Sequence, residues 1–450
     1  MGRLFGTDGV RGVANGDLTP ELCFQIGRAG ASVVARHPGP IIIGRDTRLS
    51  GSMLEAAIVA GITSVGRDAV SLGIVPTPAV ACVTRREAAA AGVVISASHN
   101  PIDDNGVKFF GPDGFKLSDT MEDEIESLLD SAALPRPTGT GIGIARLAQN
   151  LGRHYYDELY SSGADLRGLH VVVDGAYGAA YAVAPYALRK LGADVTEINC
   201  ENDGARINVD CGATNLRPLQ AAVRDCVERG IERVVGVAFD GDADRALFVD
   251  ETAAVISGDH VMFAIARDMQ AKRELAGDAV VGTVMSNIGF ERALRAHGIG
   301  LVRAAVGDRY VLEQMRAGGY ALGGEQSGHV IDFRRNTTGD GPMTAVTLLG
   351  IVASTGKRLH DLVSEVVVAP QVLINVRTPR KDVLERPEIR DAIAASERAL
   401  NGAGRLLIRP SGTEPLIRVM AEGDDPERVE QVAARLASRI QEEIGRLTET

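Results

Sequence analysis

Three aspartates alternate directly after an apolar run in the stretch VAFDGDADR, namely Asp240, Asp242 and Asp244. Carboxylates crowded at the end of a strand repel one another, and binding a hard divalent cation through oxygen ligands relieves that repulsion. Magnesium suits this position when a phosphate is also bound, because it keeps coordination sites open for substrate oxygens. The pattern therefore predicts a magnesium site, and a solvated acidic turn is the alternative.

A calcium-binding EF-hand is a rival interpretation of the same residues, because Glu251 follows them at the spacing of that loop's last ligand. However, Arg245 stands where the EF-hand loop needs glycine for its turn. Both flanks also have strand patterns, whereas an EF-hand requires helices there. We therefore reject the calcium site.

A second polar stretch interrupts a strand pattern in VVISASHNPIDDNGVKFF, residues 93–110. Proline ends hydrogen-bond pairing and Asn-Gly favours a tight reversal, so we expect a strand, an exposed polar turn and another strand. The turn contains Ser98 and His99. Hydroxyl residues are common in turns because they bond nearby backbone groups, yet loops on rigid scaffolds also carry catalytic groups. Taken alone, this stretch leaves both interpretations open.

The segment RLLIRPSGTEPLIRV, residues 405–419, has the composition of an anion-binding turn. Ser411, Gly412 and Thr413 lie between two strand-like runs and offer hydroxyls and a backbone whose N–H groups can converge on an anion. Arg409 and Arg418 flank them and can supply forked, charge-assisted bonds to phosphate oxygens. Beside a metal site, this turn predicts a phosphorylated substrate.

Alternating polar residues also mark ALGGEQSGHVI, residues 321–331, where Glu325, Ser327 and His329 occupy every second position. If the chain is extended there, all three side chains point to one side and suit the hydroxyls of a sugar. An exposed loop with incidental polar residues explains the segment equally well.

Apolar runs alternate with amphipathic helical segments along most of the chain, which predicts an α/β protein. Ligands in open α/β sheets bind at the carboxyl ends of strands, where several polar or glycine-rich turns follow these runs. The final segment predicts a helix capped by Asp425, with Pro426 at its first position. We expect strands at residues 40–44, 92–96, 169–174, 234–239, 279–284 and 371–376. The apolar stripe of the final helix comprises Val429, Val432, Leu436, Ile440 and Ile444.

Length and composition narrow the class of protein. The chain has 450 residues, enough for about three or four domains. Its net charge of -11 opposes nucleic-acid binding, which needs a basic face, and no apolar run is long enough to span a membrane. Five cysteines without C-x-x-C spacing argue against a disulfide framework and a zinc site. We expect a cytoplasmic protein.

Taken together, four motifs resemble those of the α-D-phosphohexomutase family and follow that family's order. ISASHNP is similar to its phosphoserine loop, DGDADR to its magnesium loop, GEQSGH to its sugar-recognition loop and RPSGTEP to its phosphate-binding loop. With FGTDGVRG at residues 5–12, the similarity spans nearly the whole chain. One departure is Ala243, where many relatives carry glycine, and we expect it to leave the ligand geometry intact.

The resemblance implies three related α/β domains and a smaller C-terminal α+β domain around a central cleft. A Pro- and Gly-rich stretch at residues 133–143, with a helical segment around residues 147–159 after it, marks the end of the first domain. The domains, each with one motif loop in the order given above, are expected at residues 1–150, 151–254, 255–368 and 369–450.

The same resemblance implies roles for individual residues. Ser98 would carry the transferable phosphate, and that phosphate would complete a one-magnesium site. The identity of the general acid or base stays open among Lys108, His99 and His329. The implied catalytic residues are Ser98, His99, Lys108 and Arg245. The implied metal ligands are Ser98, Asp240, Asp242 and Asp244. The implied substrate-binding residues are Arg11, Glu325, Ser327, His329, Arg409, Ser411, Gly412, Thr413 and Arg418.

Within that family, FGTDGVRG and Gln326 resemble the members that act on glucosamine phosphates. This implies an isomerase that interconverts glucosamine 6-phosphate and glucosamine 1-phosphate, with glucosamine 1,6-bisphosphate as intermediate and activator. The product would supply UDP-N-acetylglucosamine and cell-wall precursors. The alternative is a phosphoglucomutase/phosphomannomutase with the same mechanism. The expected partner is a small hexose phosphate, with neither nucleic acid nor membrane, and a homodimer is left open.

A serine hydrolase is the rival from another class of function. No G-x-S-x-G elbow surrounds Ser98, and the acidic loop would have no purpose in acyl transfer. A metal-binding sensor without catalysis is opposed by the joint presence of Ser98, Lys108 and Arg245.

Overall fold

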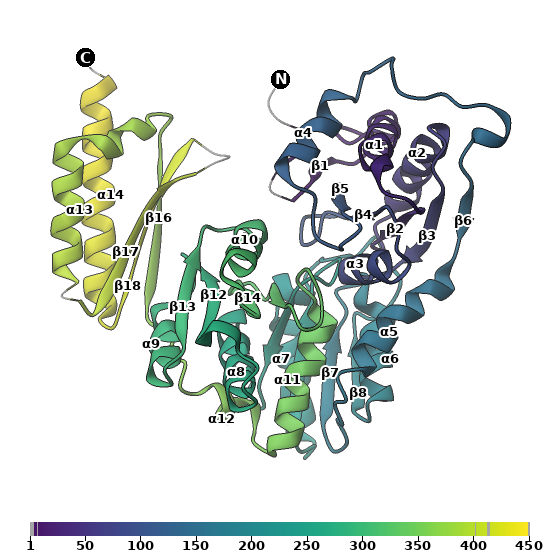
Figure 1. The fold of residues 1–450 in the computed structure, drawn as a ribbon. Coiled ribbons are helices and arrows are strands. Elements are labelled where there is room, and N and C mark those ends of the chain that lie inside the picture. Colours follow the sequence, from purple (N-terminus) through teal and green to yellow (C-terminus); the bar gives the residue numbers. More distant parts are fainter. Residues whose placement is uncertain (1–3, 7, 401, 412–414, 449–450) are drawn as a thin grey trace. The chain divides into compact units, whose positions relative to one another are not determined.

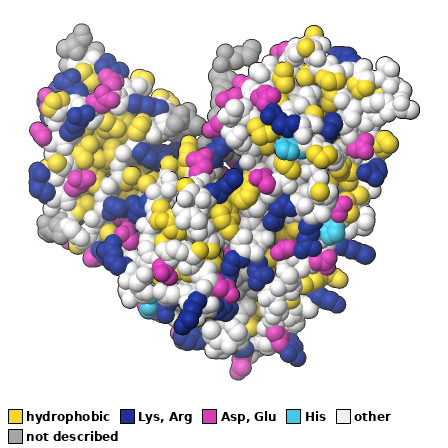
Figure 2. Space-filling view, viewed as in Figure 1, with side chains coloured by type: hydrophobic (Ala, Val, Ile, Leu, Met, Phe, Trp, Pro, Cys, Tyr) yellow, Lys and Arg dark blue, Asp and Glu magenta, His cyan; other side chains and the backbone are white. Residues whose placement is uncertain are grey.

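In the part of the chain that the structure describes, four β-sheets follow one another, as Figure 1 shows for the computed structural model. The structure describes residues 4–6, 8–400, 402–411 and 415–448. Within these ranges, no helix combines the length and the apolar character that crossing a bilayer requires. On the face seen in Figure 2, acidic and basic side chains are interspersed and do not gather by sign.

The chain divides into two compact units. The first comprises Met1–Thr283 and Val302–Ser364, and the second comprises Val284–Leu301 and Glu365–Thr450. Three of the sheets lie mainly in the first unit, and the fourth belongs to the second unit.

The first sheet has strand order β1-β5-β4-β2-β3-β6 and a helical layer on each face. Its elements are β1 (Val10–Val13), α1 (Pro20–Val33), η1 (Val34–Arg36), β2 (Ile41–Arg45), α2 (Gly51–Ser64), β3 (Ala69–Ile74), α3 (Thr77–Arg86), β4 (Ala91–Ile95), β5 (Asp104–Phe110), α4 (Asp119–Ser127), η2 (Gly139–Gly141) and β6 (Ala145–Leu147). Val93 and Ile95 pack toward α1, α2 and α4, whereas Val94 packs toward α3. Successive side chains of a strand point to opposite faces, so an unbroken apolar strand indicates a sheet covered on both sides.

The second sheet has strand order β11-β10-β9-β7-β8. Its elements are η3 (Gln149–Gly152), α5 (Arg153–Tyr160), β7 (His170–Asp174), α6 (Ala180–Lys190), β8 (Asp194–Ile198), η4 (Gly212–Thr214), α7 (Arg217–Glu228), β9 (Val234–Phe239), β10 (Ala246–Val249) and β11 (Val255–Ile256). β9 is buried along its whole length and pairs in parallel with β7. The acidic turn therefore leaves the carboxyl end of a buried strand.

The third sheet has strand order β13-β12-β14-β15. The elements of this region are α8 (Gly258–Ala271), η5 (Ala276–Asp278), β12 (Ala279–Thr283), α9 (Ile288–Ala296), β13 (Gly300–Ala304), α10 (Asp308–Gly318), β14 (Leu322–Gly324), β15 (Val330–Asp332), α11 (Gly341–Thr355) and α12 (Leu359–Val363). β14 and β15 pair antiparallel, and the five residues between them form the turn that contains Glu325.

The fourth sheet is antiparallel, with strand order β16-β18-β17. Its elements are β16 (Gln371–Arg377), η6 (Lys381–Glu385), α13 (Pro387–Ala399), β17 (Gly404–Pro410), β18 (Leu416–Gly423) and α14 (Pro426–Thr448). Figure 1 shows α13 and α14 side by side against this sheet. The Asp425 carboxylate accepts hydrogen bonds from the N–H groups of Glu427 and Arg428, which confirms the predicted cap.

The α/β class and all six predicted strands are confirmed within one residue at each end. The helix expected around residues 147–159 is wrong over its first part. Ala145–Leu147 pairs in parallel with β3, a 3-10 turn follows, and the α-helix begins only at Arg153. Asn150 and Gly152 disfavour an α-helix. Pairing with β3 favours the extended conformation of residues 145–147. The four domain boundaries stay a prediction.

Candidate functional site

The acidic turn between β9 and β10 forms a buried group of carboxylates. Asp240, Asp242 and Asp244 are each at most 4% exposed, and one ligand atom from each lies within 4.8 Å of the others. The solvated-turn alternative is therefore wrong. The flanking elements are strands, which agrees with the rejection of an EF-hand.

Two oxygens of this group are suited to a cation. Asp242 Oδ1 and Asp244 Oδ1 are buried and accept no hydrogen bond from the described residues. The other Asp242 oxygen, Oδ2, accepts hydrogen bonds from Lys108 Nζ at 2.8 Å and from Thr77 Oγ1 at 2.6 Å. A buried carboxylate oxygen without a donor is costly, so the donor set fits a hard divalent ion.

The ionisation of the turn reflects its crowding. Burial raises the pKa of Asp240 well above its ordinary value, and the charges of Asp244 and Asp242 raise it further. Burial also acts to raise the pKa of Asp244, but nearby His329 and Lys108 outweigh it and bring that pKa below the ordinary value. Burial acts to lower the pKa of Lys108, yet the surrounding carboxylates raise it. Lys108 is therefore a fixed positive charge beside the turn.

Ser98 lies directly against the acidic turn. Its Oγ donates to Asp240 Oδ2 at 2.6 Å and lies 3.2 Å from His99 Nδ1. Its backbone is left-handed, with φ of 51°. The expected strand, turn and strand are present as β4 and β5, but the turn is not exposed at this point, because Ser96 and Ser98 are each 1% exposed. Asn208 donates to the Ser98 carbonyl from the second sheet's region and helps to cover it.

Arg48 organises the Ser98 loop, and it was missed in the sequence although it lies in the polar turn RDTRLSG that directly follows the predicted strand at residues 40–44. Its side chain is fully buried and pairs with Asp46. The guanidinium donates to four backbone carbonyls of the loop, those of Ser98, Asn100, Pro101 and Asp104. Only the folded loop brings these carbonyls to one side chain, so local spacing carried no signal for this role.

Further cations surround the carboxylates. Arg245 Nε lies 3.7 Å from Asp244 Oδ1 and 4.0 Å from Asp240 Oδ2. Arg11 donates to Asn100 Oδ1 at 3.0 Å. Partial burial of the His99 ring, together with Arg245 and Arg11, lowers the pKa of His99 to about 4. Of the predicted residues, Ser98, Lys108 and Arg245 thus contact the acidic turn, whereas His99 and Arg11 contact the Ser98 loop.

The GEQSGH segment is a turn between β14 and β15 and not an extended strand, so the condition for a one-sided array of Glu325, Ser327 and His329 is not met. Glu325 accepts a hydrogen bond from the Gly307 N–H at 3.0 Å, and Ser327 Oγ donates to Glu325 at 3.3 Å. His329 is instead buried, with Nδ1 3.6 Å from Asp244 Oδ1. Gly328 has φ of +93°, and this reversal separates His329 from the half-buried Glu325 and Ser327.

The predicted phosphate-binding residues lie in the second unit. Arg409 of β17 and Arg418 of β18 are directly opposed in the sheet register. Burial lowers the pKa of Arg409, and neighbouring Arg418 lowers it further, as expected for two like charges side by side. Ser411 is buried, and this burial does not by itself indicate that Ser411 binds phosphate. Gly412 and Thr413 lie outside the described residues.

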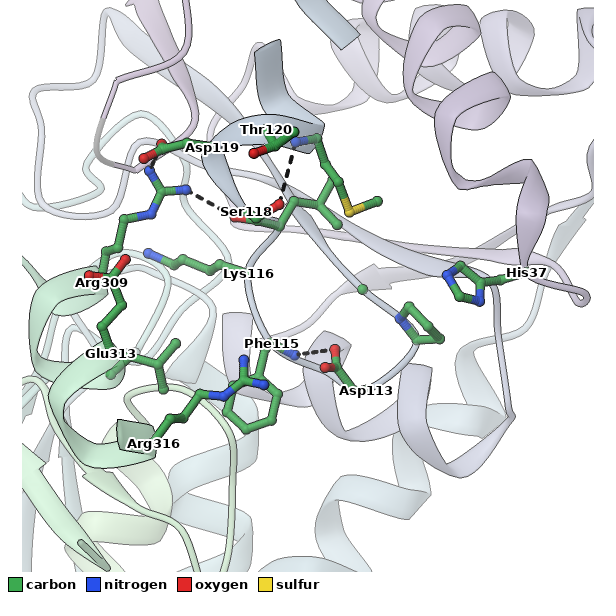
Figure 3. A pocket seen from close by; sticks show the side chains of 15 residues that line it. His37, Asp113, Phe115, Lys116, Ser118, Asp119, Thr120, Arg309, Glu313 and Arg316 are labelled. Atoms are coloured by element: carbon green, nitrogen blue, oxygen red, sulfur yellow. Dashed lines mark hydrogen bonds and ion pairs between the residues drawn. The ribbon is translucent and has the colours of Figure 1, made fainter. Parts of the chain in front are cut away.

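A cavity of about 630 Å³ lies beside the site, between the loop before α4 and helix α10 (Figure 3). Its cations already have partners. Lys116 pairs with Asp8 and Asp308, Arg309 pairs with Asp119, and the Arg316 guanidinium lies 4.5 Å from the centre of the Phe115 ring. Because Lys116 and Arg309 are paired with carboxylates and Arg316 is packed on an aromatic ring, we do not assign an anion-binding role to this cavity.

Family models match most of the chain. The four described as domains I, II and III and the C-terminal domain of phosphoglucomutase/phosphomannomutase match residues 2–136, 153–253, 257–369 and 373–439. The chain belongs to the phosphoglucomutase/phosphomannomutase family. This confirms the resemblance of its four motifs, and the chain is accordingly a mutase.

Curated relatives of this mutase match it over its full length. A protein of Thermoanaerobacter sp. (strain X514) named phosphoglucosamine mutase is 50% identical over 452 residues, covering 99% of this chain and 100% of that protein. A protein of the same name from Caldanaerobacter subterraneus subsp. tengcongensis is 51% identical, with the same coverage.

Solved structures share the fold of the mutase. A phosphoglucomutase/phosphomannomutase family protein from Burkholderia thailandensis has a TM-score of 0.82 at 23% identity, covering 98% of this chain and 97% of that one. An N-acetylphosphoglucosamine mutase from Aspergillus fumigatus has a TM-score of 0.67 at 17% identity, covering 98% and 96%. The four-domain α/β architecture expected from the sequence is confirmed.

We predict that Arg48→Lys loosens the Ser98 loop. Lysine keeps the charge beside Asp46 but cannot donate to four carbonyls, and each buried acceptor left unsatisfied costs about 1–3 kcal/mol. Amide exchange in the peptide that contains residues 96–106 should accelerate by about tenfold or more, as measured by mass spectrometry. Arg45→Lys is the matched control, because Arg45 is half-buried and pairs with Glu55. Equal protection in both variants would contradict the role of Arg48.

Proposed function

We propose that the chain interconverts glucosamine 6-phosphate and glucosamine 1-phosphate. The observation that carries this proposal is the roughly one-half identity, over the full length, to curated proteins named phosphoglucosamine mutase. Gln326 within GEQSGH and the N-terminal FGTDGVRG support the same substrate by resemblance. The second candidate is a phosphoglucomutase/phosphomannomutase. It is favoured because Glu325 and Ser327 can also form hydrogen bonds with the hydroxyls of glucose or mannose, which carry no amino group.

Ser98 is proposed to carry the phosphoryl group. The bond from phosphorus to Ser98 Oγ breaks as a bond from phosphorus to the free hydroxyl oxygen of the sugar phosphate forms, and the proton of that hydroxyl ends on Ser98 Oγ, which leaves as a neutral serine hydroxyl. The resulting 1,6-bisphosphate reorients end for end and returns its other phosphoryl group to Ser98, which restores the phosphoserine form of the enzyme. Phosphoryl transfer depends on positioning and charge neutralisation. Both are supported by the buried Ser98 Oγ, which is bonded to Asp240 of the acidic turn, and by Lys108 and Arg245, which pair with carboxylates of that turn.

One Mg²⁺ per chain is proposed at the acidic turn, held by Asp240, Asp242 and Asp244 together with the phosphate of Ser98. The buried oxygens Asp242 Oδ1 and Asp244 Oδ1, which lack donors among the described residues, support this ligand set. When bound, the ion supplies positive charge to the oxygens of the phosphoryl group. A similar structure from Aspergillus fumigatus is described as a complex with N-acetylglucosamine 6-phosphate and magnesium, and another as a complex with glucose 1,6-bisphosphate.

The remaining side chains fill four roles in this proposal. Lys108 and Arg245 hold positive charge at the reacting phosphoryl group, with His99 and Arg11 beside it. Glu325 and Ser327 contact the sugar, and His329 acts on the acidic turn, since it lies against Asp244. The non-reacting phosphate is bound by the arginine pair and its turn, formed by Arg409, Ser411, Gly412, Thr413 and Arg418.

The proposed setting is amino-sugar metabolism in the cytoplasm, where the 1-phosphate feeds UDP-N-acetylglucosamine and peptidoglycan precursors. The substrate is a small hexose phosphate, with glucosamine 1,6-bisphosphate as intermediate and activator. The state of assembly is left open between a monomer and a homodimer, and sedimentation of the purified chain would distinguish them.

We predict a phosphate on Ser98 of the purified protein. Intact-mass spectrometry should show an increment of one phosphate, localised to the peptide that contains Ser98, because the donor must persist between turnovers. Ser98→Ala should lose both the increment and nearly all turnover. Ser127→Ala, which changes an exposed serine of α4 whose hydroxyl bonds only the Glu124 carbonyl among the hydrogen bonds of the described residues, should keep the increment. A fully active Ser98→Ala variant would refute the phosphoserine mechanism.

Arg418→Ala is expected to raise the apparent KM for the sugar phosphate by about tenfold or more, with a smaller effect on kcat. The change removes a charge-assisted bond to the phosphate that does not react, which is worth roughly 1.5–3 kcal/mol. Steady-state kinetics measure both constants. Arg435→Ala is the control, because that residue lies on α14 of the same unit and lines a groove with residues of α13. A fall in kcat alone would place Arg418 at the reacting end.

Substrate choice is tested by comparing kcat/KM for the 1-phosphates of glucosamine, glucose and mannose at one magnesium and bisphosphate concentration. Glucosamine 1-phosphate should be preferred, because an anionic Glu325 accepts a stronger hydrogen bond from a protonated amine than from a hydroxyl. A preference for glucose or mannose would support the second candidate function and leave the Ser98 mechanism intact.

A further inference from the structure

Thr77 contacts the acidic turn from a helix of a different sheet. It is the first residue of α3 and is fully buried. Its Oγ1 donates to Asp242 Oδ2 at 2.6 Å, and its backbone N–H donates to the Asp242 carbonyl at 2.9 Å. One residue thus holds both the main chain and the side chain of a proposed metal ligand.

This double contact sets the direction of the Asp242 carboxylate. Oδ2 is taken up by Thr77 Oγ1 and by Lys108 Nζ, so rotation of the carboxylate would break both bonds. Oδ1 is then the oxygen left buried without a donor among the described residues. We propose that Thr77 is a positioning residue for the metal site, in that its hydroxyl aims Asp242 Oδ1 at the cation. This inference rests on the metal role proposed above for the acidic turn.

Lys108 alone would not fix the orientation of the Asp242 carboxylate. An ammonium group is a compact charge on a flexible stem, and its three donors rotate, so it fixes the position of a carboxylate poorly. A threonine at a helix start has few rotamers, and its hydroxyl is held by the backbone bond beside it. Outer partners of this kind orient metal ligands, and their loss commonly weakens metal affinity by about 10- to 100-fold.

A second buried threonine of α3, Thr84, forms its side-chain hydrogen bond within the helix and not with the acidic turn. Thr84 is fully buried, and its Oγ1 donates to the Val80 carbonyl of its own helix at 2.8 Å. It has no bond to the acidic turn among those of the described residues. Thr84→Val therefore removes a buried hydroxyl from α3 without touching Asp242, and it is a matched control for Thr77→Val.

The experiment measures Mn²⁺ binding to the full-length protein by electron paramagnetic resonance, with Mg²⁺ as competitor. Metal is first removed with EDTA, and the phosphorylation of Ser98 is matched between samples by intact mass. Thr77→Val should raise the Kd for Mg²⁺ by about 10- to 100-fold, whereas Thr77→Ser and Thr84→Val should stay within about threefold of the unaltered protein. Melting temperatures confirm that each variant is folded, and Thr77→Ala replaces Thr77→Val if the latter does not fold.

The outcomes separate this inference from the proposed metal site. If Asp242→Asn weakens Mg²⁺ binding but Thr77→Val and Thr77→Ala do not, the positioning role is wrong and the metal site stands. A loss of affinity in Thr84→Val equal to that in Thr77→Val would likewise overturn it, because packing alone would explain the effect. If Asp242→Asn leaves Mg²⁺ binding unchanged, both the metal site and the role of Thr77 fail.

Discussion

Mutual repulsion among three buried carboxylates is the interaction on which the rest of the site depends. With ligand atoms within 4.8 Å of one another, each pair of charges costs about 3–4 kcal/mol at an effective dielectric of about 20. The raised pKa of Asp240 and the positive groups around the turn both relieve this repulsion. Lys108, Arg245 and His329 do so in part, and a cation at the two oxygens that lack donors would complete the balance.

Neutralising the turn requires distant parts of the chain to meet. Lys108 comes from β5 of the first sheet, the carboxylates follow β9 of the second, and His329 precedes β15 of the third. Such close approach leaves no room for side chains at some positions. A Cβ on Gly241 would lie 2.5 Å from the Ser98 carbonyl oxygen, and one on Gly341 would lie 2.6 Å from that of Arg245. The contacts that balance the charge of the turn thus require close backbone approach, which in turn requires glycine at positions 241 and 341.

Backbone strain is concentrated at the same place. Ser98 and Ala243 have φ of 51° and 57°, in the left-handed region that costs a residue with a side chain about 1–2 kcal/mol. Glycine would adopt the Ala243 conformation without that cost, so alanine there keeps the turn at some expense of stability. Residues held in such conformations persist where the surroundings over-determine them, and the hydrogen bonds of Arg48 to the Ser98 loop are one such restraint.

The amino-acid sequence by itself determined the parts of this protein that depend on near neighbours. Continuous apolar runs specified the buried strands, and Asp425 and Pro426 specified the start of α14, because strand burial and helix capping act over a few residues. The carboxylate spacing and the order of the four motifs indicated the metal loop and the family. Three features depend on contacts between distant parts of the chain and became visible only in the fold: the burial of the Ser98 turn, the contact of His329 with Asp244 in place of an array with Glu325, and the strand at residues 145–147. Thr77 and Arg48 also acquire their contacts only after folding, because hydrogen bonds across 165 and 50 residues of chain leave no trace in local sequence spacing.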